Sequence, residues 1–133
     1  MADTRIHPET GAVLRRDVRA FAVRYRAREI VVDLPGWYPD DNSDALHVGN
    51  DMAAADAALA ALKIEVRKEL AAYVAAVRKK LKLSQRQAGD LIGGGPRAFQ
   101  KYESGEVEPS EAMLKLLRLL ENDPARLDEL QTA

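Results

Sequence analysis

The 133-residue sequence contains no cysteine and only two histidines, His7 and His47. The absence of cysteine excludes disulfide bonds, cysteine-ligated zinc and thiol catalysis within this chain. No run of 18 apolar residues is present, and the first eleven residues lack the apolar core of a secretory signal. We therefore expect a cytoplasmic protein with no membrane segment, no bound metal and no cofactor.

Other arrangements typical of enzymes and metal sites are also absent from the sequence. No nucleophile–base pair is apparent, and the Gly93–Gly95 run lacks the Lys-Ser/Thr of a phosphate-binding loop. Asp40, Asp41 and Asp44 lack the glycine and terminal glutamate of a calcium loop and are interpreted as a solvated loop. His7 and His47 are interpreted as surface residues. We do not expect an enzyme.

The net charge of −1, from 20 basic and 21 acidic residues, conceals strongly charged segments. Residues 78–101 carry seven bases and one acid, whereas residues 33–56 carry six aspartates and no base. A basic block in a near-neutral chain favours a local site for a polyanion, although a solvated helix face would have the same composition.

The N-terminal half has a pattern typical of β-structure. Residues 1–12 are predicted to form a loop or arm, because proline and glycine interrupt them. Alternating apolar and polar residues across 13–34 predict two antiparallel strands that turn near Arg26–Arg28. Pro35-Gly36 is predicted to end the second strand, and an acidic loop follows to about residue 50.

A long helix is predicted next, because residues 51–82 contain eleven alanines and no glycine or proline. Asn50 or Asp51 is the expected N-cap, and a break near residues 65–70 remains open. We place the domain boundary there, with one domain over 1–67 and another over 68–133.

Capping residues divide the second domain into five short helices across 70–130. Ser84 and Gln87 form a predicted capping box for a helix over 85–92, which ends at a triple glycine. Pro96 is placed at the first position of the next helix, over 96–103, which stops at Ser104-Gly105. Helices opened by Pro109-Ser110 and by Pro124 complete the domain. The fold class is therefore α+β.

Two short helices joined by a glycine turn indicate a helix-turn-helix, whose second helix enters the major groove of DNA. In a helical projection of 96–103, Arg97, Gln100 and Lys101 fall opposite the apolar side chains. Arginine and lysine recognise guanine and glutamine recognises adenine, so these three are predicted to read bases, with a solvated surface as the alternative. Contacts to the DNA backbone are predicted for Lys79, Lys80, Lys82, Gln85 and Arg86.

Three stretches together resemble the helix-turn-helix of MqsA-type antitoxins. They are KKLKLSQRQA at 79–88, IGGGPRAFQKYESG at 92–105, and Pro109 with LKLLRLL at 114–120. In the broader Xre/Cro-like class the turn is usually not a triple glycine, so this feature favours the MqsA type.

The resemblance implies an antitoxin that neutralises an mRNA-cleaving toxin through its N-terminal half. It also implies a C-terminal half that forms a homodimer, binds a palindromic operator and represses its own operon. By motif position, the base-reading pair of the family falls on Arg97 and Lys101. The family's two CxxC pairs, which bind structural zinc, are replaced here by RIHP at 5–8 and PDDN at 39–42, which implies the same domain without metal.

The toxin-facing residues follow from no motif, and several interpretations stay open. Arg24, Arg26 and Arg28 either meet an acidic partner or form the exposed face of a β-ribbon. Trp37 and Tyr38 are either a partner-binding hot spot or part of a small core. Leu114 and Leu119 suit either packing within the domain or a dimer interface. The alternative function is a stand-alone Xre-family regulator whose N-terminal half senses a ligand or partner.

Overall fold

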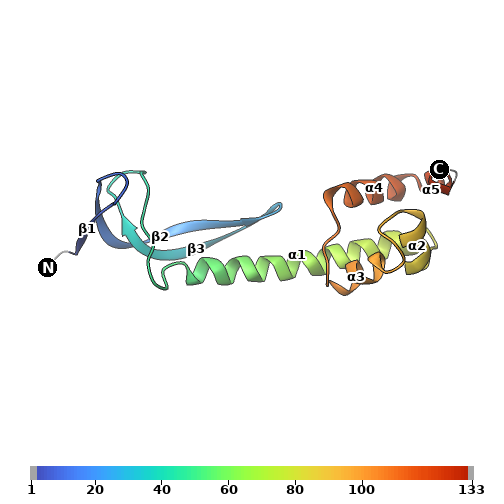
Figure 1. The fold of residues 1–133 in the computed structure, drawn as a ribbon, viewed down its shortest axis with the longest axis horizontal. Coiled ribbons are helices and arrows are strands. Elements are labelled where there is room, and N and C mark those ends of the chain that lie inside the picture. The colour runs from blue at the N-terminus through green and yellow to red at the C-terminus, as the bar shows by residue number, and fades with distance from the viewer. Residues whose placement is uncertain (1–2, 132–133) are drawn as a thin grey trace. The chain divides into compact units, whose positions relative to one another are not determined.

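The computed structural model describes residues 3–131 of the chain. The described residues form three strands and five α-helices in the order shown in Figure 1. These are β1 (Thr4–Ile6), β2 (Val13–Tyr25), β3 (Arg28–Tyr38), α1 (Ala53–Lys80), α2 (Gln85–Leu91), α3 (Ala98–Ser104), α4 (Glu111–Asn122) and, after a 3₁₀ turn at Pro124–Arg126, α5 (Leu127–Gln131). The predicted α+β class is confirmed. The chain divides into two compact units, up to Lys63 and from Ile64 onward.

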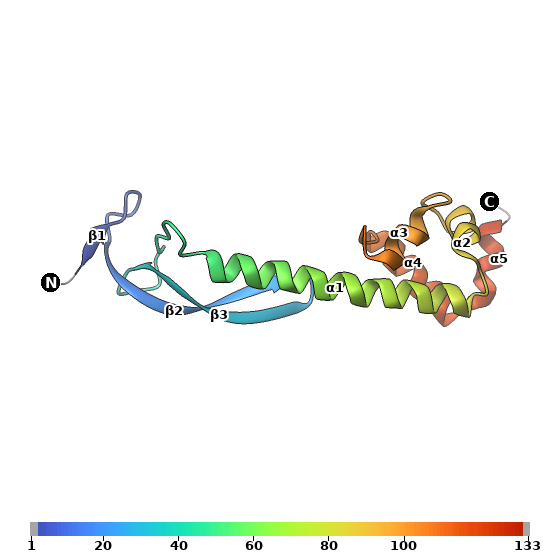
Figure 2. The ribbon, with the colours of Figure 1, turned by 90° about the horizontal axis from the view of Figure 1, so that it is seen from below.

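The first unit is an antiparallel sheet in the order β1-β2-β3. Its main part is a long ribbon of β2 and β3, paired from Arg15↔Tyr38 to Tyr25↔Arg28 (Figure 2). One face of the ribbon packs on the N-terminal part of α1, where Val23 and Leu34 meet Ala55, Ala58 and Leu62. Because side chains alternate between faces, the opposite face is left uncovered and carries exposed valines, Val18 and Val31.

Two predictions for the strands of this unit are wrong. Residues 1–12 are not simply an arm, because Thr4–Ile6 pair with β2. Pro8 and Gly11 belong to the connection between these strands, which the His7 N–H closes by donating to the Ala12 carbonyl at 2.9 Å. The second strand does not end at Pro35-Gly36 but continues to Tyr38. Proline is tolerated there because β3 is an edge strand. No further strand lies on its outer side, so a missing N–H on that side costs no hydrogen bond between strands.

Helix α1 runs without a break from Ala53 to Lys80, and the two units join within it. The predicted N-cap at Asn50 or Asp51 is wrong, because Met52 directly precedes the helix and the Asp51 carboxylate accepts the Val48 N–H at 2.9 Å instead. None of the helices among residues 3–131 combines the length and apolar character that crossing a lipid bilayer requires.

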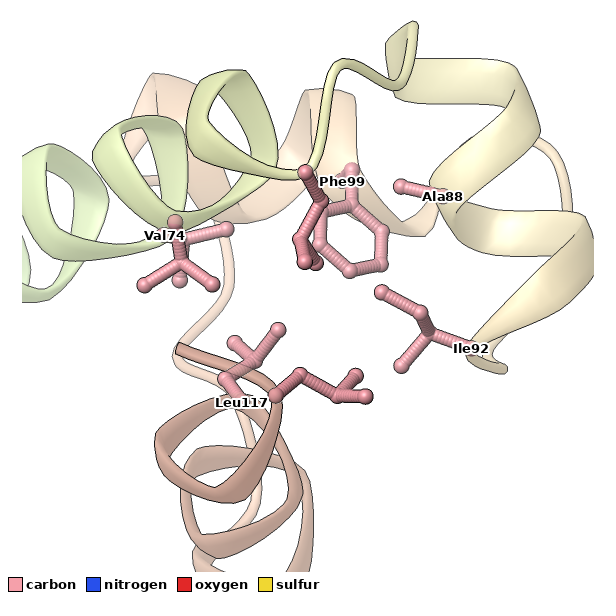
Figure 3. Close-up of a cluster of buried hydrophobic side chains, with 8 residues drawn as sticks. Val74, Ala88, Ile92, Phe99 and Leu117 are labelled. Atoms are coloured by element: carbon pink, nitrogen blue, oxygen red, sulfur yellow. The ribbon is translucent and has the colours of Figure 1, made fainter. Parts of the chain in front are cut away.

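The second unit encloses one apolar core. Figure 3 shows Val74 of α1, Ala88 of α2, Phe99 of α3 and Leu117 of α4 directed toward a common centre, with Ile92 beside them. Val74, Ala88, Phe99 and Leu117 are fully buried. Each helix from α1 to α4 contributes to this cluster, so the core fixes the place of α3 against the other helices.

The local caps of this unit follow the sequence closely. The Ser84 hydroxyl accepts the Gln87 N–H, and the Gln87 side chain accepts the Ser84 N–H, which confirms the capping box. The Ser110 hydroxyl accepts the Met113 N–H at 3.1 Å and caps α4. Pro96 is the exception, because α3 begins two residues later, at Ala98, with Arg97 as its N-cap.

Candidate nucleic-acid interface

The turn between α2 and α3 depends on glycine. Gly93, Gly94 and Gly95 have φ values of 138°, 94° and 91°, a region that other residues rarely adopt. A Cβ atom on Gly89 of α2 would lie 1.9 Å from the Gly95 carbonyl oxygen. The turn therefore packs directly on α2, and a side chain at Gly89 would block this contact.

Helix α3 separates a buried side from an exposed side. Phe99 is fully buried, and its ring meets that of Tyr102 edge-on at 5.5 Å between centroids. Arg97, Gln100 and Lys101 are exposed, as the helical projection predicts. The helix ends at Gly105, which adopts φ 79° and donates its N–H to the carbonyls of the preceding turn. The three polar side chains are thus presented to solvent from a firmly anchored helix.

A largely buried ion pair, which no sequence pattern singled out, ties α3 to the end of α1. Arg78 donates from Nε and Nη2 to the two carboxylate oxygens of Glu103, at 2.7 and 2.8 Å. Arg78 also donates to the Leu83 carbonyl at 2.9 Å, just before α2 begins. The side chains are 14% and 10% exposed. One arginine therefore joins α1, the segment before α2, and α3.

The electrostatics of this pair favour both charged forms. The hydrogen bond with Glu103 is the main cause that raises the pKa of Arg78. Burial by itself would raise the pKa of Glu103, but the hydrogen bonds from Arg78 and from Gln85 outweigh it, and the pKa is lowered. Both groups are therefore ionised at neutral pH.

The predicted backbone-contacting residues do not share one environment. Lys79, Lys82 and Arg86 are exposed. Lys80 donates from Nζ to the Glu121 carbonyl at 2.8 Å, near the end of α4. Gln85 is partly buried and hydrogen-bonded to Glu103, so it belongs to the ion-pair network.

The candidate partner-binding residues of the first unit lie at two places on the ribbon. Arg24, Arg26 and Arg28 lie at the β2–β3 turn, where Arg24 pairs with Glu29 at 3.1 Å. Trp37 is partly exposed near the other end of β3. Tyr38 is 9% exposed and donates its hydroxyl to the Leu34 carbonyl at 2.7 Å, so it is a core residue.

A second ion pair, which the sequence did not indicate, joins β2 to the segment just before α1. Arg16 of β2 donates to Asp51 at 2.8 Å from Nη1, and its guanidinium lies 5.7 Å from the Trp37 ring centroid. Arg5 of β1 lies 4.6 Å from the same centroid. Asp51 is 5% exposed, and the hydrogen bond from Arg16 holds the pKa of its carboxyl well below the ordinary value.

Both histidines contact backbone groups of the first unit through Nδ1. The prediction of a surface position is wrong for His7, which is 5% exposed and accepts the N–H groups of Glu9 and Thr10 at Nδ1. His47 is partly buried, with Nδ1 3.1 Å from the Pro35 carbonyl oxygen. Between residues 3 and 131 no three metal-ligating side chains are grouped as an ion would require. In the acidic loop that contains Asp40, Asp41 and Asp44, the Asp41 carboxylate accepts the Ser43 N–H at 2.8 Å.

Comparison with known proteins identifies the family. The family model described as the antitoxin component of a bacterial toxin-antitoxin system, MqsA, matches residues 8–131. Antitoxin MqsA of Escherichia coli (strain K12) is 42% identical over 59 residues, which make up 44% of this chain and 45% of that protein. The aligned segment thus spans less than half of this relative. Because the family model matches nearly the whole chain, the resemblance predicted from the helix-turn-helix is confirmed, and this chain belongs to the MqsA family of antitoxins.

Proposed function

We propose that this antitoxin neutralises a cognate mRNA-cleaving toxin and represses its own operon by sequence-specific DNA binding in the cytoplasm. The observation that carries the DNA-binding part is the exposure of Arg97, Gln100 and Lys101 on α3 while Phe99 anchors the same helix in the core. These side chains have the donors and acceptors that distinguish guanine and adenine in the major groove.

The rigidity of the motif supports the same proposal. Base readout requires side chains on a helix whose position does not change from one binding event to the next. The Arg78–Glu103 pair and the glycine turn hold α3 from both sides. Exposed Lys79, Lys82 and Arg86 add attraction for phosphates that does not depend on sequence.

We further propose that the second unit forms the homodimer. A groove between α4 and α5 is lined mainly by leucines, and Leu119 at its edge is 54% exposed. Two-fold symmetry would place two copies of α3 on half-sites about 10 base pairs apart, or a multiple of that spacing. The operator is then a palindrome.

The proposed toxin site is the first unit. Its ribbon has an uncovered face with exposed Val18 and Val31, and basic side chains, including Arg24, at its turn. Arg26 and Arg28 belong to the same basic end, and the partly exposed Trp37 lies near the other end of β3. Tyr38 supports this surface from the core instead of contacting the partner. No enzymatic activity is proposed.

The DNA-binding part is tested with the promoter region of the chain's own operon. The purified chain should protect a palindromic segment from nuclease and bind it far more tightly than random DNA. Arg97→Ala should reduce this preference, while Arg15→Ala, at an exposed arginine of β2 in the other unit, should leave it intact. Equal affinity for promoter and random DNA contradicts operon repression.

The toxin part is tested with the neighbouring reading frame. Its product should arrest growth and cleave mRNA when expressed alone, and the present chain should co-purify with it and restore growth. If the neighbour is harmless and does not co-purify, the chain is better described as a stand-alone regulator that binds DNA.

A further inference from the structure

A shallow groove of about 230 Å³ runs along one side of α3. Four of its residues come from α3 and its N-cap, and one comes from each flanking loop. They are Gly94, Arg97, Ala98, Lys101, Tyr102 and Val107. Two predicted base-reading residues therefore line a groove that also has an apolar part.

The apolar part of the groove is open to solvent. Val107 is 44% exposed although it stands between Glu106 and Glu108 in a polar loop. Its N–H donates to the Lys101 carbonyl at 3.3 Å, so the loop is fastened to the last turn of α3. Ala98 and Tyr102 are partly buried and complete the apolar surface. An exposed valine held in place beside two cations has no evident role in the core.

Gly94 keeps one end of this groove free. A Cβ atom there would lie 2.7 Å from the Ala98 Cβ and 3.4 Å from the Tyr102 hydroxyl oxygen. Any side chain at this position would project into the space beside these two residues. The glycine turn therefore shapes the groove in addition to joining the two helices.

Charge complementarity identifies the kind of molecule that would fill the groove. Arg97 and Lys101 are exposed at its edge and favour a polyanion, so a free apolar ligand is a poor match. In the major groove of DNA, the apolar group that a base presents is the 5-methyl group of thymine, and small apolar side chains are its usual contacts. Because Arg97, Lys101 and Val107 line the same groove, one DNA segment can contact a cation and the valine together.

We propose that this groove receives the 5-methyl group of a thymine in the operator, which makes Val107 a specificity-determining residue. The inference rests on the DNA binding proposed above and adds a recognition chemistry that Arg97, Gln100 and Lys101 do not supply. Loss of one methyl contact corresponds to about a fourfold loss of affinity, from about 0.8 kcal/mol for each buried methyl-sized group.

The test uses the full-length chain and DNA selected by it from a random duplex library. Each thymine of the selected site is replaced in turn by deoxyuridine, which removes the methyl group and keeps the base pairing. The chain should bind about fourfold more weakly when one particular thymine in each half-site is replaced. Val107→Ala should bind the thymine duplex more weakly and lose most of this difference, while its affinity for the deoxyuridine duplex stays near that of the unchanged chain.

A matched control is Val48→Ala, which shortens an exposed valine in the other unit and should keep the full thymine preference. If the library yields no preferred sequence, the proposed DNA-binding function itself fails. If it yields a preferred sequence but no thymine replacement changes affinity, or Val107→Ala retains the thymine preference, DNA binding stands and the methyl contact is wrong.

Discussion

Arg78 and Glu103 are 25 residues apart in the sequence and joined by two hydrogen bonds, from Nε and Nη2 of the arginine to the two carboxylate oxygens. A planar guanidinium matches a carboxylate in this two-bond geometry, which lysine cannot reproduce. The pair connects the last turns of α1 to the helix that carries the candidate base-reading residues. Its strength should therefore affect both the stability of the second unit and the placement of α3.

Replacing Arg78 should destabilise the protein strongly. Arg78→Ala leaves a largely buried carboxylate without its main partner, which should lower the free energy of unfolding by about 2–3 kcal/mol. Urea unfolding followed by circular dichroism measures the loss. The matched control is Arg15→Ala, which breaks an exposed pair with Asp40 and should cost less than about 0.5 kcal/mol. Equal losses for the two variants would show that the Arg78–Glu103 pair contributes no more to the free energy of unfolding than an exposed ion pair does.

The Arg16–Asp51 pair predicts a dependence of stability on pH. The pKa of Asp51 is lowered in the folded chain from its ordinary value of 3.8, mainly by the hydrogen bond from Arg16. The unfolded chain therefore takes up a proton first as the pH falls. The stabilisation by this carboxylate is complete well above pH 4 and is lost progressively below it.

Asp51→Asn isolates this contribution from that of other carboxyl groups. The variant should be less stable than the unchanged chain at pH 7, and the difference should narrow toward pH 3. Trp37, the single tryptophan, lies beside Arg16 and reports on this unit by fluorescence during urea unfolding. Asp40→Asn, at an exposed carboxylate, should produce a small difference at both pH values. A constant difference for Asp51→Asn would rule out its ionisation as the cause.

Gly89 is expected to be the most sensitive glycine of the helix-turn-helix. In Gly89→Ala the new methyl group would lie 1.9 Å from a backbone oxygen, which cannot move without opening the turn. We expect a loss of about 3 kcal/mol, at the upper end of overpacking effects. Gly105→Ala is the control, because its φ of 79° is strained but its surroundings are open. That variant should lose about 1–2 kcal/mol. Thermal melts of both variants decide whether close packing or backbone strain matters more.

The features that the sequence predicted correctly depend on neighbouring residues. The capping box of Ser84 and Gln87 acts over three residues, and the Gly105 cap follows from the need for a left-handed conformation at a helix end. The exposed side of α3 follows from helical periodicity around the buried Phe99. Such local rules need no knowledge of which distant segments meet.

The features that were missed depend on distant contacts. Pro35-Gly36 breaks an isolated strand, but pairing with Val18 and Asp17 across the ribbon keeps both residues in β3. Asp51 resembles an N-cap until Arg16, 35 residues earlier in the chain, is placed beside it. Pairings of this kind are decided by the folded chain as a whole, so one sequence does not reveal them.

The last prediction separates base readout from general attraction to DNA. Arg97 is an exposed N-cap of α3, so Arg97→Ala should leave the fold unchanged and weaken operator binding by about 1–3 kcal/mol. It should also relax the preference at one base position. Lys101→Ala should act at a neighbouring position, more weakly if lysine makes a single bond.

Arg86→Ala is the contrasting variant, because Arg86 is exposed on α2 and is predicted to contact phosphate. It should weaken binding to all sequences alike and reduce the slope of log affinity against log salt by about one. Fluorescence anisotropy with operator and random duplexes, at several salt concentrations, measures both effects. If Arg97→Ala lowers affinity equally for the two duplexes, Arg97 contacts phosphate. The exposed side of α3 is then not the side that reads the operator.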